Sequence, residues 1–575
     1  MPAKTSKKRR GGGSAAMTRP GPAPAPQVVE AAPQVRDPRP TRQQPRRQTR
    51  RPTPTKPPFG TGALAYWRRL VTAEPWLPRV FGPESALWVA LLLTVPIVYV
   101  LLDLTVGPRL DRAPAVDVDY WWHLATGNWV LDHHRPPTTD PYSWTYGGKT
   151  WIAHEWLAET ILALGSRVGG YAANIVLTAI IAVIGFWRLM AGARYYGISR
   201  RTAAVVMLLF GGVFLRSGAL VVRPQVWSWT LLAILLAELA AYDTGRRKTL
   251  WAVPVIFAVW INMNLTALIG IGCLGAFVLD RLIRPPIDRH VVKVGVLSGL
   301  ALLINPHHIH ILFLIFKYLD PNSVRRQYIF EWMAPRTSDH SHIPYWIALV
   351  LVVPAIYFLA RKRPHFWPCA PLLVLAYQSH QSIRYIPIFI MLVFITIGWL
   401  NWQWLTPRTA EPAPAKPPLI PHRPWVVVPP LLACALAVWL ALSTDPTQFR
   451  RNPYTWNHPA GAATFYLKNY PNTRIFNTYD FGGYLIYRFY GTDNKVYIDG
   501  REEMYGEERV RRYFYYIYGR DGWQDYFDEQ GIDVVIIRRI DGLTSKISKD
   551  PGWVRVYCGD AFVFVRASLH PKTSC

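Results

Sequence analysis

The chain has 575 residues, of which 51% are hydrophobic, 14% aromatic and only 17% charged, and it contains 25 tryptophans. Soluble proteins of this length usually carry about 25% charged residues, so the composition argues against a soluble protein. Apolar runs such as Ala86–Val106 and Trp425–Leu442 approach the roughly 20 residues that a helix needs to cross a membrane. We therefore expect a polytopic α-helical membrane protein.

The first part of the chain, residues 1–84, is basic and rich in proline, glycine and alanine. Much of the formal net charge of +28 lies in its first sixty residues, in runs such as Lys7–Arg10. This composition cannot bury a core, and it predicts a disordered cytoplasmic tail that touches anionic lipid headgroups. Nucleic-acid binding is the minor interpretation and we do not predict it. A cleavable signal is not predicted either, because the tail is too long and the apolar run behind it can span.

Short basic loops mark the cytoplasmic side of a membrane protein. About eleven spans, with the N-terminus inside, put every basic loop on that side. The predicted transmembrane domain covers residues 85–443, with a first outer loop at 107–170, and residues 444–575 follow outside the cell. The chain is thus expected in the plasma (inner) membrane as a multi-pass protein. The basic residues assigned to the inside by this scheme are Arg194, Arg200, Arg201, Arg246, Arg247, Lys248, Arg281, Arg284, Arg289, Arg361, Lys362 and Arg363.

The same scheme gathers polar residues on the outer face, where ionised groups beside a bilayer are costly and usually functional. The first outer loop is predicted to hold two tryptophan-rich amphipathic helices at 121–131 and 151–164, joined by the proline-rich turn 136–141. Such a loop is suited to holding a lipid-linked substrate. The outer polar residues are Asp117, Asp119, His123, Asp140, His154, Glu155, Arg223, Gln225, His307, His308, Glu331 and Arg384.

Acid–base chemistry on a lipid-linked substrate follows from these residue types. We predict that Asp119, or secondly Asp117, takes a proton from an acceptor hydroxyl. Arginines hold phosphate through paired N–H donors, which makes Arg223 and Arg384 the phosphate candidates. The pair His154–Glu155 is predicted to assist proton transfer or to orient the sugar.

Structural interpretations of these residues remain open. The structural alternative for Asp117 is a helix cap, and the structural alternative for His154–Glu155 is a polar pair at a helix start. Arg223 alone is a reasonable snorkelling side chain. A divalent cation at Asp117 and Asp119 is an open alternative, because hard cations favour carboxylate oxygens, but the ligand set is incomplete. No other cofactor is predicted.

The last segment, residues 444–575, alternates strand and helix patterns and predicts a small α/β domain. Strands are expected at 474–477, 495–498 and 533–537, with a closing hairpin formed by 554–557 and 562–565. The string Asp499–Glu502 follows a predicted strand end and is interpreted as a salt-bridged turn, with ligand binding as the alternative. Cys558 and Cys575 are able to pair if this region is extracellular. The other cysteines fall in apolar segments.

The motifs resemble those of a family of bacterial polytopic membrane proteins that are similar in architecture to the GT-C class of glycosyltransferases. The resemblance covers nearly all of the chain from the first span onward, and it implies a polyprenyl-phosphate sugar donor and an acidic residue in the first outer loop. One departure is Asn264, where the pattern has a histidine. The matching strings are Asp117–His123, Thr126–Trp129, Asp140–Ser143, His154–Leu157, Arg223–Gln225, Glu331–Trp332, Arg384–Pro387, Asn477–Tyr484, Ile498–Arg501 and Tyr505–Gly506.

The function predicted from residues and resemblance together is a membrane glycosyltransferase for an envelope glycan or lipid acceptor, by hexosyl or pentosyl transfer. His123, Gln225, Glu331 and both arginines are expected to bind the substrate. No nucleotide site is expected, because the donor arrives already linked to lipid. The alternatives are a flippase for a lipid-linked sugar and a non-catalytic envelope assembly protein. Charges at the outer edge and the lack of an internal repeat argue against the flippase.

Overall fold

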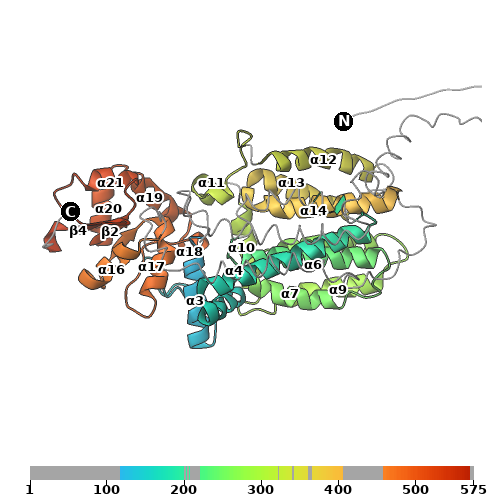
Figure 1. Ribbon diagram of the computed structural model, residues 1–575, viewed down its shortest axis with the longest axis horizontal. Coiled ribbons are helices and arrows are strands. Elements are labelled where there is room, and N and C mark those ends of the chain that lie inside the picture. The colour runs from blue at the N-terminus through green and yellow to red at the C-terminus, as the bar shows by residue number, and fades with distance from the viewer. Residues whose placement is uncertain are drawn as a thin grey trace, which may run out of the picture. The chain divides into compact units, whose positions relative to one another are not determined.

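The structure is a computed structural model that describes residues 117–199, 202–203, 206, 221–320, 323–339, 342–360, 365–405, 458–569 and 575. The chain divides into two compact units, 1–57 and 58–575, and every described residue lies in the second. The predicted basic tail, spans one and eleven, most of span three and Cys434 lie outside the described residues. The described part is mostly helical with one small sheet (Figure 1).

The predicted helices of the first outer loop are present, although the second begins later than expected. Helix α3 (Tyr120–His133) agrees with the prediction, whereas α4 (Trp156–Tyr195) starts five residues after Trp151. The delay has a local cause, because the Trp151 N–H donates to the carbonyl of Thr138 and holds the chain extended there. At Gly170, with φ of 64°, α4 bends, and the part after the bend, Ala173–Tyr195, is long and apolar enough to cross a membrane.

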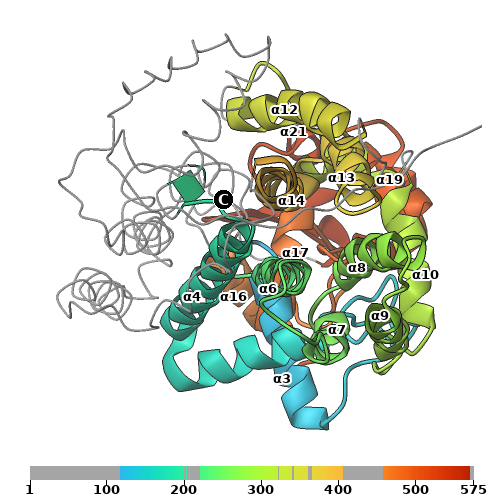
Figure 2. The same cartoon turned by 90° about the vertical axis from the view of Figure 1, so that its right-hand side faces the viewer.

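Three described helices are long and apolar enough to cross a membrane, at Ala173–Tyr195, Gln225–Asp243 and Ile383–Gln403. The other described helices at predicted spans are shorter, so the count of eleven remains a prediction. Helices α4 and α6 pack together, as do α7 with α9 and α13 with α14 (Figures 1 and 2). The helical elements after α4 are α6 (Gln225–Asp243), α7 (Ala252–Met263), α8 (Ala267–Leu282), α9 (Arg289–Ala301), α10 (His310–Leu319), α11 (Arg325–Tyr328), η3 (Phe330–Trp332), α12 (Ile343–Ala360), α13 (Cys369–Gln381), η5 (Ile383–Tyr385), α14 (Ile386–Leu400) and η6 (Asn401–Leu405).

Helix α14 lies at the centre of this helical core. Its side chains are apolar on all sides and nearly all are buried, as expected for a helix enclosed by other helices. It contacts α4, α12 and α13. By contrast α12 carries no charged residue and leaves Val350 and Val353 exposed, so its outward face suits lipid.

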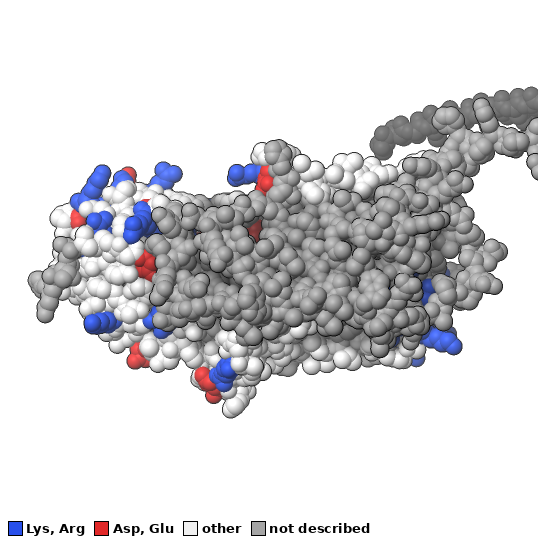
Figure 3. All heavy atoms as spheres, viewed as in Figure 1, with Lys and Arg blue, Asp and Glu red and all other residues white. Residues whose placement is uncertain are grey.

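The C-terminal segment forms a four-stranded sheet in the order β1-β2-β4-β3, with β1 and β2 parallel and the other pairs antiparallel. The predicted closing hairpin is confirmed, and Cys558 and Cys575 form a disulfide. On the face shown in Figure 3, charged side chains of the described residues concentrate over this segment. Its elements are α16 (Ala460–Asn469), β1 (Ile475–Asn477), η9 (Tyr479–Phe481), α17 (Gly482–Phe489), α18 (Glu502–Tyr505), α19 (Glu507–Ile517), α20 (Trp523–Gln530), β2 (Val534–Ile537), α21 (Gly542–Ile547), β3 (Trp553–Cys558), β4 (Phe562–Arg566) and η10 (Ala567–Leu569).

The strand predicted at 495–498 is wrong, for a reason that matters to the site. Val496 donates its N–H to the carbonyl of Tyr142 and accepts from the N–H of Trp144, so this stretch pairs with the first outer loop instead of the sheet. Trp122 and Trp151 of that loop also belong to the hydrophobic core of the C-terminal segment. The outer loop and the C-terminal segment therefore share one core, which fixes the residues between them.

Candidate functional site

A cavity of about 560 Å³, here called the charged cavity, lies where the first outer loop, the loop before α6, the chain after α10 and the C-terminal segment meet. All the site residues predicted from the sequence line it. They come from positions far apart in the chain, which only the tertiary fold brings together. These residues are Asp117, Asp119, His123, His154, Glu155, Arg223, Gln225, Glu331 and Arg384.

A chain of ion pairs runs along one wall of the charged cavity. Arg223 contacts Asp119, and its Nε lies 2.5 Å from Asp117 Oδ1. Its Nη1 lies 3.1 Å from Glu331 Oε2, and Glu331 Oε1 in turn lies 2.8 Å from Arg384 Nη1. Three carboxylates thus share two guanidinium groups.

These contacts decide two of the open structural interpretations. Arg223 is not a snorkelling side chain, because it is 10% exposed and lies against three carboxylates. Asp117 does not cap α3, because its Oδ1 accepts from the N–H of Asp119, which is itself the residue before the helix. The side chains of Asp117 and Asp119 are therefore turned toward the arginine.

Because Gly500 of the C-terminal segment has no side chain, the carboxylate of Asp119 fits against its backbone. A Cβ built on Gly500 would lie 2.1 Å from Asp119 Oδ1 and 3.2 Å from Trp122 Nε1. Next to it, Arg501 forms ion pairs with Asp499 and with Asp140 of the outer loop. The string Asp499–Glu502 is thus the salt-bridged turn that the sequence predicted, and its glycine also shapes the wall of the charged cavity.

Burial sets the ionisation of the carboxyl groups on this wall. It raises the pKa of Asp119 to about 8; Arg223 opposes this effect, and Asp117 and Glu331 add to it. Burial likewise raises the pKa of Asp117. For Glu331 burial acts in the same direction, but the guanidinium groups of Arg384 and Arg223 outweigh it and lower the pKa. The wall therefore combines Asp119, whose carboxyl group titrates near neutral pH, with Glu331, whose carboxyl group stays ionised.

A second polar group lies deeper, around His123. Its Nδ1 lies 2.9 Å from Glu159 Oε1 and 3.7 Å from Glu155 Oε2, and all three side chains are buried. Asn264, at the position where the family pattern has a histidine, donates from its side-chain amide to Glu155. His154 and Glu155 stand just before α4, as the polar pair at a helix start that the sequence indicated, and the Glu155 carboxylate is also part of this buried network.

Sequence reasoning missed Glu159 and Glu503, and it named Glu502 only as the last residue of the turn Asp499–Glu502. Glu159 follows Glu155 by four residues on a helix, a spacing that puts both on one face and was a usable signal. Glu502 and Glu503 line the charged cavity from the C-terminal segment. Burial raises the pKa of Glu502 to about 7, while Arg325 opposes that shift.

The sequence alternative of a cation between Asp117 and Asp119 is not favoured by this geometry. Arg223 already supplies the positive charge to both carboxylates. Among the described residues, the group whose ligand atoms lie close enough to hold a metal is His123, Glu155 and Glu159.

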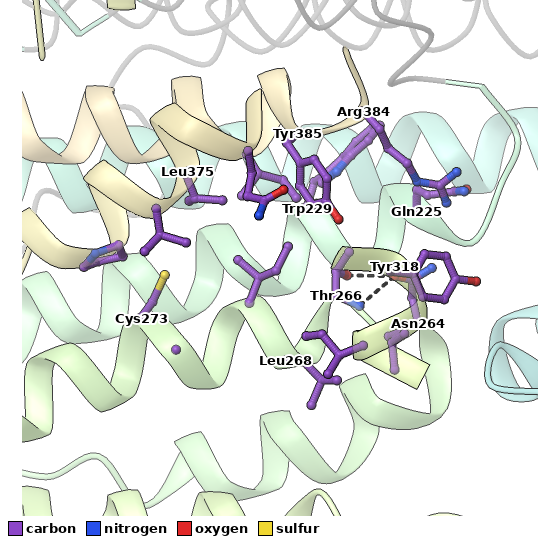
Figure 4. Close-up of a pocket in the computed structure, with 18 of the residues that line it drawn as sticks. Gln225, Trp229, Asn264, Thr266, Leu268, Cys273, Tyr318, Leu375, Arg384 and Tyr385 are labelled. Atoms are coloured by element: carbon purple, nitrogen blue, oxygen red, sulfur yellow. Dashed lines mark hydrogen bonds between the residues drawn. The ribbon is translucent and has the colours of Figure 1, made fainter. Parts of the chain in front are cut away.

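A second hollow of about 310 Å³, here called the apolar pocket, adjoins the charged cavity between α8 and α13. Arg384, Gln225 and Tyr318 line both hollows. In Figure 4 these polar side chains lie together at one end of the pocket, while Cys273 and Leu375 lie at the other. The two hollows together thus have a charged end and an apolar end.

These features define a mostly helical membrane protein with a charged cavity that continues into an apolar pocket. No protein family model matches the chain, and no curated protein matches it. Among solved structures it is similar to an oligosaccharyltransferase from Archaeoglobus fulgidus, in the apo form and tethered to an acceptor peptide containing the NVT sequon via a disulfide bond. For each, the TM-score is 0.47 at 11% identity, covering 80% of this chain and 70% of that chain.

Proposed function

We propose that this protein is a membrane glycosyltransferase that moves a sugar from a polyprenyl-phosphate donor to a glycan or lipid acceptor of the cell envelope. One observation carries the proposal. The charged cavity, with its carboxyl of raised pKa, adjoins the apolar pocket, and Arg384 lines both. A lipid-linked sugar phosphate has the same division into an apolar chain, an anionic phosphate and a polar sugar.

Each part of the donor has its counterpart in the two hollows. The polyprenyl chain occupies the apolar pocket, between Leu268 and Leu375. The phosphate lies beside Arg384, which is 25% exposed and, among the described residues, forms an ion pair with the carboxylate of Glu331 alone. Arg223, held by three carboxylates, positions Asp117 and Asp119 and does not bind phosphate directly. The sugar extends into the charged cavity, toward Gln225 and His154.

The reaction is a displacement at the anomeric carbon. Asp119 takes the proton of an acceptor hydroxyl as that oxygen forms a bond to the anomeric carbon. The bond from the anomeric carbon to the phosphate oxygen breaks, and the electron pair leaves with the polyprenyl phosphate. Arg384 neutralises the charge of the leaving phosphate. Attack opposite to the leaving group inverts the configuration, and the products are the glycosylated acceptor and polyprenyl phosphate.

The acceptor enters from the C-terminal side of the charged cavity. Aromatic residues line this side, with the rings of Tyr328 and Phe514 stacked 4.4 Å apart and Tyr479 and Tyr518 beside them. Aromatic faces with polar tips suit a ligand that has both apolar faces and hydroxyl groups, as sugars do. The charged cavity is then on the outer face of the plasma membrane, with the N-terminus in the cytoplasm.

Replacement of Asp119 by asparagine is expected to lower the transfer rate by about 10² to 10⁴, the usual contribution of a general base. The assay supplies the purified full chain with a radiolabelled polyprenyl-phosphate sugar and membrane-derived acceptors, and measures release of polyprenyl phosphate. Ser545→Ala, on the exposed surface, is the matched control. Unchanged turnover in Asp119→Asn would refute the proposal, as would donor movement across the bilayer without turnover in the unmodified chain.

The pH dependence of transfer follows from the pKa of Asp119. A base must be deprotonated, and a carboxyl whose pKa is raised to about 8 is mostly protonated at pH 7. We therefore expect kcat/KM to rise with pH, with a midpoint near 8, whereas an ordinary aspartate would give a plateau above pH 5. The rising limb should be absent from the residual activity of Asp119→Asn.

Replacement of Gly500 by alanine is expected to lower kcat about 100-fold while the protein still folds. The added methyl group takes the place of Asp119 Oδ1 and turns the carboxylate away from the acceptor, and small misplacements of a catalytic group have effects of this order. Gly299→Ala is the matched control, because a Cβ on Gly299 meets nothing within 4 Å. Equal kcat in the two variants would contradict the role of Gly500.

A further inference from the structure

The proposed reaction leaves a buried polar group unused, at His123, Glu155 and Glu159. Glu155 is the residue just before α4, Glu159 lies one turn further along that helix, and the His123 ring from α3 faces both. Their potential ligand atoms lie within 4.8 Å of one another. His123 and Glu155 also line the charged cavity, so the group is accessible from it.

The group contains a buried polar atom that the described residues leave without a hydrogen bond. Glu159 is 1% exposed, and its Oε2 has no hydrogen-bond partner among the described residues. Arg501, a cation that acts on Glu159, is bound to Asp140 and Asp499. An unpaired buried carboxylate oxygen is costly, and groups of this kind are normally satisfied by a partner or an ion.

We propose that this group binds one divalent transition-metal ion, with one imidazole nitrogen and two carboxylates as protein ligands. The imidazole ligand suits Zn²⁺ better than Mg²⁺ or Ca²⁺, which prefer sites made of oxygen alone, and the two carboxylates also suit Mn²⁺. Three protein ligands leave positions open, and these face the charged cavity through His123 and Glu155. The ion adds positive charge to the cavity at a place distinct from the arginines.

Residues around the group are arranged as supporting partners of metal ligands usually are. Asn264 donates a hydrogen bond to Glu155 and accepts two from Thr266, so it is itself held in place. His154 Nδ1 lies 3.3 Å from the carbonyl of Ile152, which orients the ring and leaves Nε2 3.9 Å from Glu155 Oε1. Such second contacts fix the direction of a ligand and are worth 10- to 100-fold in metal affinity in known sites, by order of magnitude.

The test uses Mn²⁺ alone with the full chain, purified in detergent and stripped with a chelator. Titration followed by electron paramagnetic resonance should give one tightly bound ion per chain. Electron spin echo modulation of that ion should show one imidazole nitrogen. Glu159→Gln and His123→Gln should each weaken the Kd at least 10-fold, and Mn²⁺ should raise the Tm of the unmodified chain more than that of either variant.

Asp119→Asn is the matched control and should leave the Kd within about twofold, because Asp119 lies outside the group. Loss of binding in Asp119→Asn with retention in Glu159→Gln would overturn the proposal and move the ion to the aspartates. Absence of saturable binding, or of nitrogen modulation, would show instead a protonated Glu159 bonded to His123. The readout is binding, so its failure is separate from failure of the transferase proposal. The modulation experiment needs no variant, so a misfolded variant does not obscure the answer.

Discussion

Replacement of Arg501 by methionine is expected to lower the free energy of unfolding by about 3 to 5 kcal/mol, the usual result of removing one partner of a buried ion pair. The Arg501 side chain is fully buried, with Nη1 2.8 Å from Asp140 Oδ1 and Nη2 2.7 Å from Asp499 Oδ2. Its guanidinium also lies 4.6 Å from the ring centroid of Trp151. Methionine fills part of the space but leaves two carboxylates unpaired.

The Arg501→Met variant should lose stability overall and also hold its outer loop less firmly, because Arg501 joins the outer loop to the C-terminal segment. Thermal unfolding in detergent should give a clearly lower Tm, and limited proteolysis should cut the first outer loop earlier. Arg512→Met is the matched control: Arg512 forms an exposed ion pair with Glu508, which is worth about 0 to 1 kcal/mol. Equal Tm values for the two variants would contradict the assigned role of Arg501. Arg501→Lys should fall between them, because lysine keeps the charge but not the planar fork.

Much of the site was predictable because membrane topology constrains the chain strongly. The basic loops predicted which polar residues share a face, and the chemistry of the side chains then singled out Asp119, Arg223 and Arg384 from segments far apart in sequence. Helix α3 agrees with its predicted range within two residues at each end. Glu159 was within reach of the same reasoning, through its spacing from Glu155.

The failures have a common physical cause, which is that long-range partners override local pattern. The stretch 495–498 is apolar and β-branched like a strand, yet it bonds to Tyr142 and Trp144, more than 300 residues earlier. No local pattern announces that Arg501 reaches Asp140, or that Arg223 is shared by three carboxylates. The apolar pattern of a predicted span also does not show where its helix ends. Helices α7 and α13 end well short of the roughly 20 residues that a full span needs.

Replacement of Arg384 by glutamine is expected to lower transfer by about 10³ to 10⁵, the range found where an arginine stabilises a departing or transferring phosphate. Two effects add. The leaving polyprenyl phosphate loses its cation, and Glu331, freed from its 2.8 Å contact with Arg384, adds a repelling negative charge. The donor KM should rise and kcat should fall, because in the proposed reaction Arg384 contacts the phosphate before and during bond breaking.

Arg384→Lys separates charge from geometry. Lysine keeps the positive charge near Glu331 but loses the paired donors and the contact with Trp332, whose ring centroid lies 4.8 Å from the guanidinium. We therefore expect an intermediate loss, mostly in kcat. Arg488→Gln, which removes a cation that donates to Thr464 and Tyr484 outside both hollows, is the control and should transfer normally. If Arg384→Gln kept the donor KM and kcat of the control, the phosphate would have to bind elsewhere. The contact between the charged cavity and the apolar pocket would then no longer support the proposed function.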